Sequence, residues 1–79
     1  MTRRDKTCVI NDFLEAVDNG FVRTTELMSH VGLSYTKLQE YWVITLKSRL
    51  VEKNEGKLRI TEKGRAYISG YHFLEDLLK

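Results

Sequence analysis

The sequence predicts a small α+β domain that is mainly helical and ends in a long helix. Two helix caps, at Thr24 or Thr25 and at Ser34, lie too close together for a long loop to separate the two helices. The run Asn54-Glu55-Gly56 has the composition of a hairpin turn between two short strands. Residues 62–78 then carry large apolar side chains at helical spacing.

Length and composition limit the class of protein. A chain of 79 residues is expected to form one domain, 1–79, with a small core. Its hydrophobic fraction of 42% is too high for a disordered chain, and no apolar run approaches the roughly 20 residues of a membrane span. Asn11, Asp12 and Glu15 interrupt the start, so no signal peptide is expected. We therefore expect a cytoplasmic protein without membrane contacts.

The first helix is expected at residues 3–18, with Thr2 or Asp5 as its cap and Asn19-Gly20 at its end. Cys8, the single cysteine, allows two interpretations: a half-buried free thiol, or a disulfide between two copies of the chain. The apolar stripe of this helix consists of Val9, Ile10, Phe13, Leu14 and Val17.

A tight pair of helices follows. The first is expected at residues 25–31, with an apolar stripe, and ends at Gly32, where a left-handed backbone stops a helix. Leu33 fills the turn, and Ser34 caps a second helix at residues 35–48. Two helices joined so tightly cross at a steep angle, which predicts a helix-turn-helix. The stripe of the shorter helix consists of Leu27, Met28 and Val31.

The second helix of the pair has an apolar and a mixed face. The mixed face also holds Glu40, Val43 and Ile44. Because the start of this helix enters the major groove in such motifs, Gln39 is a candidate for adenine, Lys37 for guanine or a phosphate, and Thr36 for base edges or a thymine methyl. The core face consists of Leu38, Tyr41, Trp42, Thr45 and Leu46. The groove candidates are Ser34, Tyr35, Thr36, Lys37 and Gln39, although Tyr35 also fits a core or turn position.

A basic hairpin, or wing, is expected at residues 50–60. Net charge is only +2, but residues 33–65 hold eight basic and four acidic side chains, whereas residues 1–32 hold four and five. Such a local excess attracts phosphates. A solvated lysine-rich surface that keeps an edge hairpin from pairing is the alternative. The phosphate candidates are Lys47, Lys53, Lys57 and Arg59.

The run LSYTKLQEYWVITLKSRLVEKNEGKLRITEKGRAYI resembles the small winged-helix DNA-binding proteins common in archaea and their viruses. The resemblance covers roughly residues 22–70, and Arg49 departs from it where glycine is usual. It implies a winged helix-turn-helix fold in which Phe21-Val22-Arg23 pairs as a third strand, and DNA binding by a dimer that regulates transcription, inside a host cell if the protein is viral. The matching residues are Leu33, Ser34, Tyr35, Leu38, Tyr41, Leu50, Val51, Ile60, Thr61 and Gly64.

The last helix, capped by Thr61, is expected to form a dimer interface. Its large apolar side chains exceed what one small core needs, and Gly70 would let a second helix approach. The alternative is packing on the first helix of the same chain. Lys63 and Arg65 in its first turn call for a negative partner, of which DNA phosphate is a candidate. The proposed seam consists of Tyr67, Tyr71, Leu74 and Leu78.

No catalytic or metal-binding pattern is present in the sequence. His30, His72 and Cys8 are scattered, and no phosphate-binding glycine loop occurs, so neither an enzyme nor a cofactor, metal or small-molecule effector is expected. The sequence thus predicts sequence-specific binding of double-stranded DNA by a homodimer, as a transcriptional regulator. A protein–protein assembly adaptor, favoured by exposed Val43 and Ile44, and a non-specific chromatin-type binder are the alternatives.

Overall fold

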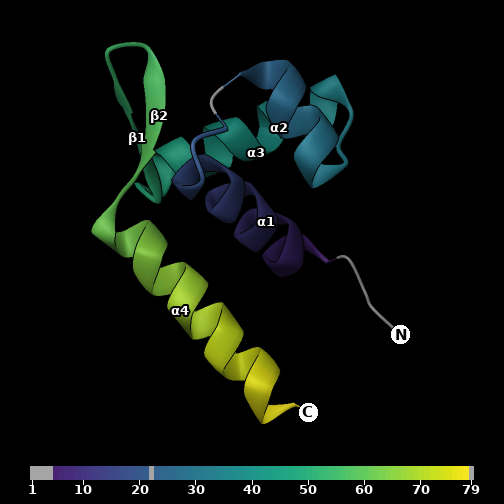
Figure 1. The fold of residues 1–79 in the computed structure, drawn as a ribbon, viewed down its shortest axis with the longest axis vertical. Helices are drawn as coiled ribbons and strands as arrows, with labels where there is room; N and C mark the ends of the chain where they lie inside the picture. The colour runs from purple at the N-terminus through teal and green to yellow at the C-terminus, as the bar shows by residue number, and fades with distance from the viewer. Residues whose placement is uncertain (1–4, 22, 79) are drawn as a thin grey trace.

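Four helices and one β-hairpin make up the fold in the computed structural model, which describes residues 5–21 and 23–78 (Figure 1). The hairpin and α4 leave the end of the helical body in different directions (Figure 1). In chain order the elements are α1 (Lys6–Asp18), α2 (Thr24–Val31), α3 (Tyr35–Lys47), β1 (Val51–Asn54), β2 (Lys57–Ile60) and α4 (Glu62–Leu77).

Helix α1 supplies the centre of the core. Asp5 caps it by accepting a hydrogen bond from the Cys8 backbone N–H at 2.9 Å, whereas Thr2 lies outside the described residues. The ring of Phe13 meets Trp42 of α3 edge to face, with centroids 6.3 Å apart, so that α1 and α3 share one apolar contact. The predicted stripe is confirmed, since all its members are buried: Val9, Ile10, Phe13, Leu14 and Val17.

The turn between α2 and α3 also follows the sequence. Gly32 ends α2 with φ at +77°, and its N–H and that of Leu33 both donate to the carbonyl of Met28. The predicted threonine cap is wrong, because α2 begins one residue earlier than expected. Thr24 is already helical, and the cap position is Arg23, which makes no side-chain capping hydrogen bond.

The sheet consists of β1 and β2 only, within the described ranges. Val51 pairs with Ile60 and Asn54 with Lys57, which leaves Glu55-Gly56 as a two-residue turn with positive φ at both positions. The expected third strand is therefore absent at Phe21 and Arg23, while Val22 lies outside the description. Instead, Phe21 closes the end of α1 through a bond to the Ala16 carbonyl and stacks on His30, with centroids 4.5 Å apart.

Helix α4 meets α1 as far as Tyr71 and His72 and exposes the large apolar side chains that follow. The Tyr67 hydroxyl donates to the carbonyl of Thr7 in α1 at 3.0 Å. Burial raises the pKa of Tyr67, and a hydrogen bond with Cys8 raises the pKa of Tyr71 well above its ordinary value. Both tyrosines of the proposed dimer seam therefore contact α1, as the alternative interpretation expected. By contrast, Leu74 is 58% and Leu78 is 83% exposed.

Cys8 is half-buried at this contact. Its hydrogen bond with Tyr71 places it between α1 and α4 of the same chain. A disulfide between two copies stays a prediction.

Candidate nucleic-acid interface

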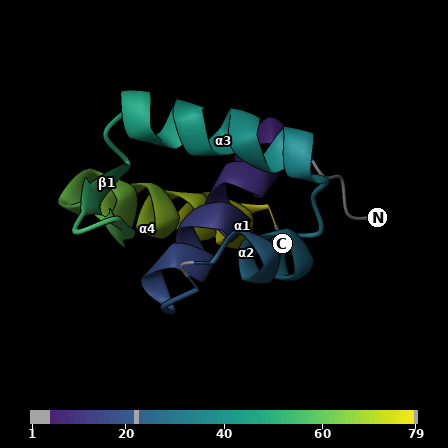
Figure 2. The same cartoon turned by 90° about the horizontal axis from the view of Figure 1, so that it is seen from above.

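One face of α3 is free of contacts with the other helices. Figure 2 shows α3 along one edge of the molecule, with α1, α2 and α4 all on the same side of it. The opposite face is packed as predicted: Leu38 and Thr45 are fully buried, and Tyr41, Trp42 and Leu46 pack partly against the core. Ile44 corrects the predicted division of faces, because it also packs partly against the core.

The start of α3 presents the predicted groove candidates in different ways. Tyr35 is 59% exposed, which excludes the core position. The hydroxyl of Ser34 accepts from the Lys37 backbone N–H at 3.3 Å, so its oxygen is engaged as the helix cap. The Lys37 ammonium lies 3.4 Å from the Glu40 carboxylate, one turn along the helix. This pair leaves the first turns of α3 close to neutral.

The hairpin divides the predicted phosphate candidates between its two faces. Arg59 pairs across the strands with Glu52, and Lys57 pairs with Asn54, so these four side chains share one face. Lys53 lies opposite Leu58, on the face that carries the buried side chains. All three cations are exposed, as is Lys47 at the end of α3. Lys47 thus ends α3 itself and Lys53 lies on β1, which packs against α3, whereas Arg59 lies on β2, which packs against α1.

A junction of residues 48–50 and 61–64 joins the end of α3 to the start of α4; we call it the α3–α4 junction. The Thr61 hydroxyl donates to the carbonyl of Arg49 at 2.6 Å and accepts from the Gly64 N–H at 3.0 Å, which confirms Thr61 as the cap of α4. Gly64 is buried against Leu50. The start of α4 is thus tied to the chain that leaves α3.

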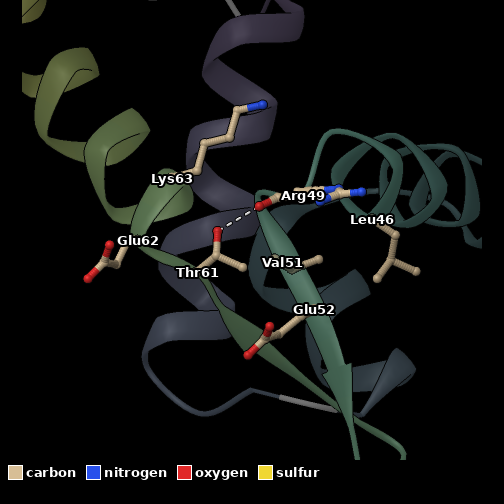
Figure 3. A pocket seen from close by; sticks show the side chains of 7 residues that line it. All are labelled: Leu46, Arg49, Val51, Glu52, Thr61, Glu62 and Lys63. Atoms are coloured by element: carbon tan, nitrogen blue, oxygen red, sulfur yellow. Dashed lines mark hydrogen bonds between the residues drawn. The ribbon is translucent and has the colours of Figure 1, made fainter.

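The α3–α4 junction borders a pocket of about 640 Å³ that has no uniform charge. Figure 3 shows the Thr61 hydroxyl bonded to the Arg49 carbonyl at this pocket, while the side chains of Arg49 and Lys63 leave in different directions. Glu52 and Glu62 offset the two cations. Because two acids and two bases line it, the pocket does not by itself select an anion.

Lys63 and Arg65 find the expected negative partners within the chain rather than in DNA phosphate, which was one candidate. The Lys63 ammonium donates to the carbonyl of Ser48 at 2.8 Å, at the negative end of α3. The Arg65 guanidinium lies 3.4 Å from the Asp18 carboxylate at the end of α1. Both contacts join positions far apart in the sequence, so helical spacing alone did not reveal them.

Arg49 is a cation that the predicted site omitted. It follows the C-terminal end of α3 and has φ at +60°, in the left-handed region where glycine is favoured. Its N–H and that of Leu50 bond back to the carbonyls of Leu46 and Thr45, which closes the helix. Strained backbone is often retained at functional sites. The arginine at a position where glycine is usual was therefore a signal in the sequence that could have pointed to Arg49.

Replacing Arg49 tests whether its strained backbone is retained because its positive charge contributes to DNA binding. We expect Arg49→Gly to raise the free energy of unfolding by about 1 kcal/mol, because glycine removes the left-handed backbone cost. We also expect it to weaken DNA binding, because a cation beside α3 is lost. Arg49→Ala is the matched control: it should weaken binding equally without the gain in stability. Urea denaturation and fluorescence anisotropy measure the two effects, and unchanged DNA affinity in both variants would remove Arg49 from the interface.

Within the described ranges, no three His, Cys, Asp or Glu side chains are grouped to hold a metal ion. No helix in the same ranges has both the length and the apolar character needed to cross a membrane.

Comparison with known proteins decides the family. The family model described as winged helix-turn-helix matches residues 3–79, nearly the whole chain. The chain belongs to the winged helix-turn-helix family. No curated protein matches it significantly. In winged helix-turn-helix terms, α2 and α3 form the helix pair, α3 is the recognition helix, and β1 and β2 form the wing. Membership implies binding to double-stranded DNA.

Proposed function

We propose that the protein is a homodimeric transcriptional regulator that binds specific sites in double-stranded DNA through α3 and the wing. The observation that carries the proposal is the face of α3 that no other helix covers, together with exposed cations at the C-terminal end of α3 and on the wing. An α-helix fits the major groove, and cations beside it position the protein on the phosphates. The proposed groove residues are Ser34, Tyr35, Thr36, Lys37 and Gln39.

The phosphate contacts are proposed to come from the end of α3 and from the wing. Each of these side chains is exposed and carries a positive charge. They add affinity and orientation but no sequence information. The proposed set is Lys47, Lys53, Lys57 and Arg59, to which the left-handed Arg49 is added.

The proposed dimer uses the exposed end of α4. Four of the six exposed large hydrophobic side chains in the described residues lie in the last six of these residues: Phe73, Leu74, Leu77 and Leu78. Such a patch on a small chain marks an interaction surface. A second copy of the same helix suits it, because a two-fold axis brings the same apolar residues together. Tyr67 and Tyr71 then support α4 from within their own chain.

If the exposed end of α4 forms the dimer interface, a charge introduced there should produce a monomer. We expect Leu74→Glu to shift the protein from dimer to monomer in sedimentation velocity, because a buried carboxylate opposes association. Val43→Glu is the matched control, since Val43 is 47% exposed but lies on α3, and it should remain dimeric. A wild-type protein that sediments as a monomer at high concentration would refute the dimer but not DNA binding.

The test of the function is titration of random-sequence duplex DNA at several salt concentrations by fluorescence anisotropy. Binding through several phosphates makes the logarithm of affinity fall steeply with the logarithm of salt concentration, by about 0.9 for each contact. Selection from a random duplex library then reports whether one sequence is preferred. A steep salt dependence without a preferred sequence would indicate a non-specific binder.

A protein–protein adaptor is the second candidate, because Val43 is exposed on α3 where a groove-facing helix is usually polar. Absence of binding to any duplex at low salt would favour this candidate.

A further inference from the structure

The free face of α3 is unusually apolar for a surface proposed to contact DNA. Thr36, Gln39, Glu40, Val43 and Ile44 line a shallow and mainly apolar hollow of about 540 Å³ on this face. They recur at spacings of three and four, so they form one continuous stripe along the helix. Val43 is 47% exposed within this stripe, whereas Ile44 at its edge packs partly against the core.

Charge distinguishes this stripe from the surfaces that read guanine. Lys37 is the only basic residue between positions 35 and 46, and Glu40 holds its ammonium at 3.4 Å. Guanine is read most often by arginine or lysine, which donate to its O6 and N7 atoms. Of the two cations of α3, Lys37 is paired with Glu40 and Lys47 lies at the C-terminal end, so the centre of the helix lacks that donor.

The chemistry that remains matches the A·T base pair. An amide such as that of Gln39 both accepts from adenine N6 and donates to adenine N7. An apolar side chain such as that of Val43 contacts the C5-methyl group of thymine, which only this base pair presents in the major groove. Gln39 and Val43 are four residues apart, so both side chains lie on the same side of α3.

We infer that α3 reads A·T base pairs, with Gln39 bound to adenine and Val43 packed on a thymine methyl group. The inference rests on the proposed function, because it places α3 in the major groove. The exposed cations at the end of α3 and on the wing provide the charge complementarity that brings this apolar stripe to DNA. The exposed apolar side chain that favoured a protein partner thereby becomes the element that selects the base.

Three duplexes of equal length separate the two contacts. The first has a central block of A·T pairs in mixed order. The second replaces each thymine of that block by deoxyuracil, which removes only the methyl group. The third replaces A·T by inosine·5-methylcytosine, which keeps the methyl group and the minor-groove pattern but exchanges the adenine N6 donor for an acceptor. The wing cannot distinguish these duplexes by minor-groove hydrogen bonds.

We expect wild-type protein to bind the deoxyuracil duplex about fourfold more weakly for each methyl group that Val43 covers. Binding to the inosine duplex should fall about tenfold, since the amide pair with adenine is lost. Val43→Ala should bind the first two duplexes equally, and Gln39→Ala should bind the first and third equally. Both variants should retain the wild-type salt dependence, because neither residue is charged.

The possible outcomes distinguish failure of the A·T inference from failure of the proposed DNA-binding function. If wild type binds all three duplexes equally with a steep salt dependence, DNA binding stands and A·T reading is wrong. If Val43→Ala still distinguishes thymine from deoxyuracil, another residue or the shape of the duplex reads the methyl group, and the assignment to Val43 is overturned. If no duplex binds at low salt, the proposed function itself fails. Urea denaturation of both variants excludes loss of folding as the cause.

Discussion

Replacing Gly64 by alanine is expected to destabilise the protein by about 3 kcal/mol and to lower Tm by roughly 15 °C. A Cβ atom at this position would overlap the carbonyl oxygen of Leu50 and lie 2.7 Å from Cγ1 of Ile60. The first obstacle is backbone, so it cannot rotate away. The α3–α4 junction would have to open, which also strains the hydrogen bond from the Gly64 N–H to Thr61. Thermal and urea unfolding measure the loss.

Gly70→Ala provides the matched control in the same helix. No atom lies within 4 Å of a Cβ built there, so the substitution meets no obstacle. We expect it to stabilise the chain by up to about 1 kcal/mol, since alanine favours a helix more than glycine does. Equal effects of the two substitutions would show that Gly64 is not required by close packing. If Gly70→Ala weakens the proposed dimer while stabilising the chain, a second helix approaches α4 at this position.

Removing the three cations of the wing together is expected to abolish most of the DNA affinity. In the triple variant Lys53→Ala, Lys57→Ala and Arg59→Ala, we expect affinity to fall about 500-fold at 0.1 M salt if each residue neutralises one phosphate. The salt dependence of the logarithm of affinity should fall by about 2.7 for the same reason. All three side chains are exposed, so the free energy of unfolding should change little. Anisotropy titrations at several salt concentrations measure both quantities.

Glu55→Gln is the matched control on the same hairpin. It removes a negative charge from the turn, so we expect slightly tighter DNA binding and no loss of salt dependence. A triple variant that binds as tightly as wild type would place the wing away from DNA. The three cations would then only keep the hairpin from pairing with other chains, as the alternative interpretation from the sequence states.

The sequence predicted the features that depend on local periodicity. The stripe of α1, the glycine that ends α2 and the threonine that caps α4 each follow from side chains within a few residues. The winged helix-turn-helix fold is confirmed by the family match. These features could be predicted because helical spacing and capping depend only on residues that are close in the sequence.

The errors concern contacts between distant segments. Thr24 is not a cap, because α2 begins one residue earlier than predicted. Helical spacing does not determine the first residue of a helix. Ile44 lies at the edge of the apolar stripe, so the crossing angle of the helices decides whether it is covered. Lys63 reaches Ser48 across fifteen positions, and the left-handed backbone of Arg49 is held by the Thr61 hydroxyl twelve positions away. The DNA-contacting residues stay predictions.

The α3–α4 junction has a consequence for the spacing of the DNA site. In the proposed dimer, α4 joins the two copies and α3 enters the groove, so the short path through Arg49 and Thr61 connects the subunit contact to the base contact. The two recognition helices must meet major grooves about 34 Å apart. The junction is closed by hydrogen bonds and a buried glycine, so it holds α4 and α3 of each copy in a fixed relative orientation. With this orientation fixed, the dimer would bind DNA sites with one half-site separation and would bind poorly to sites with one base pair inserted or removed.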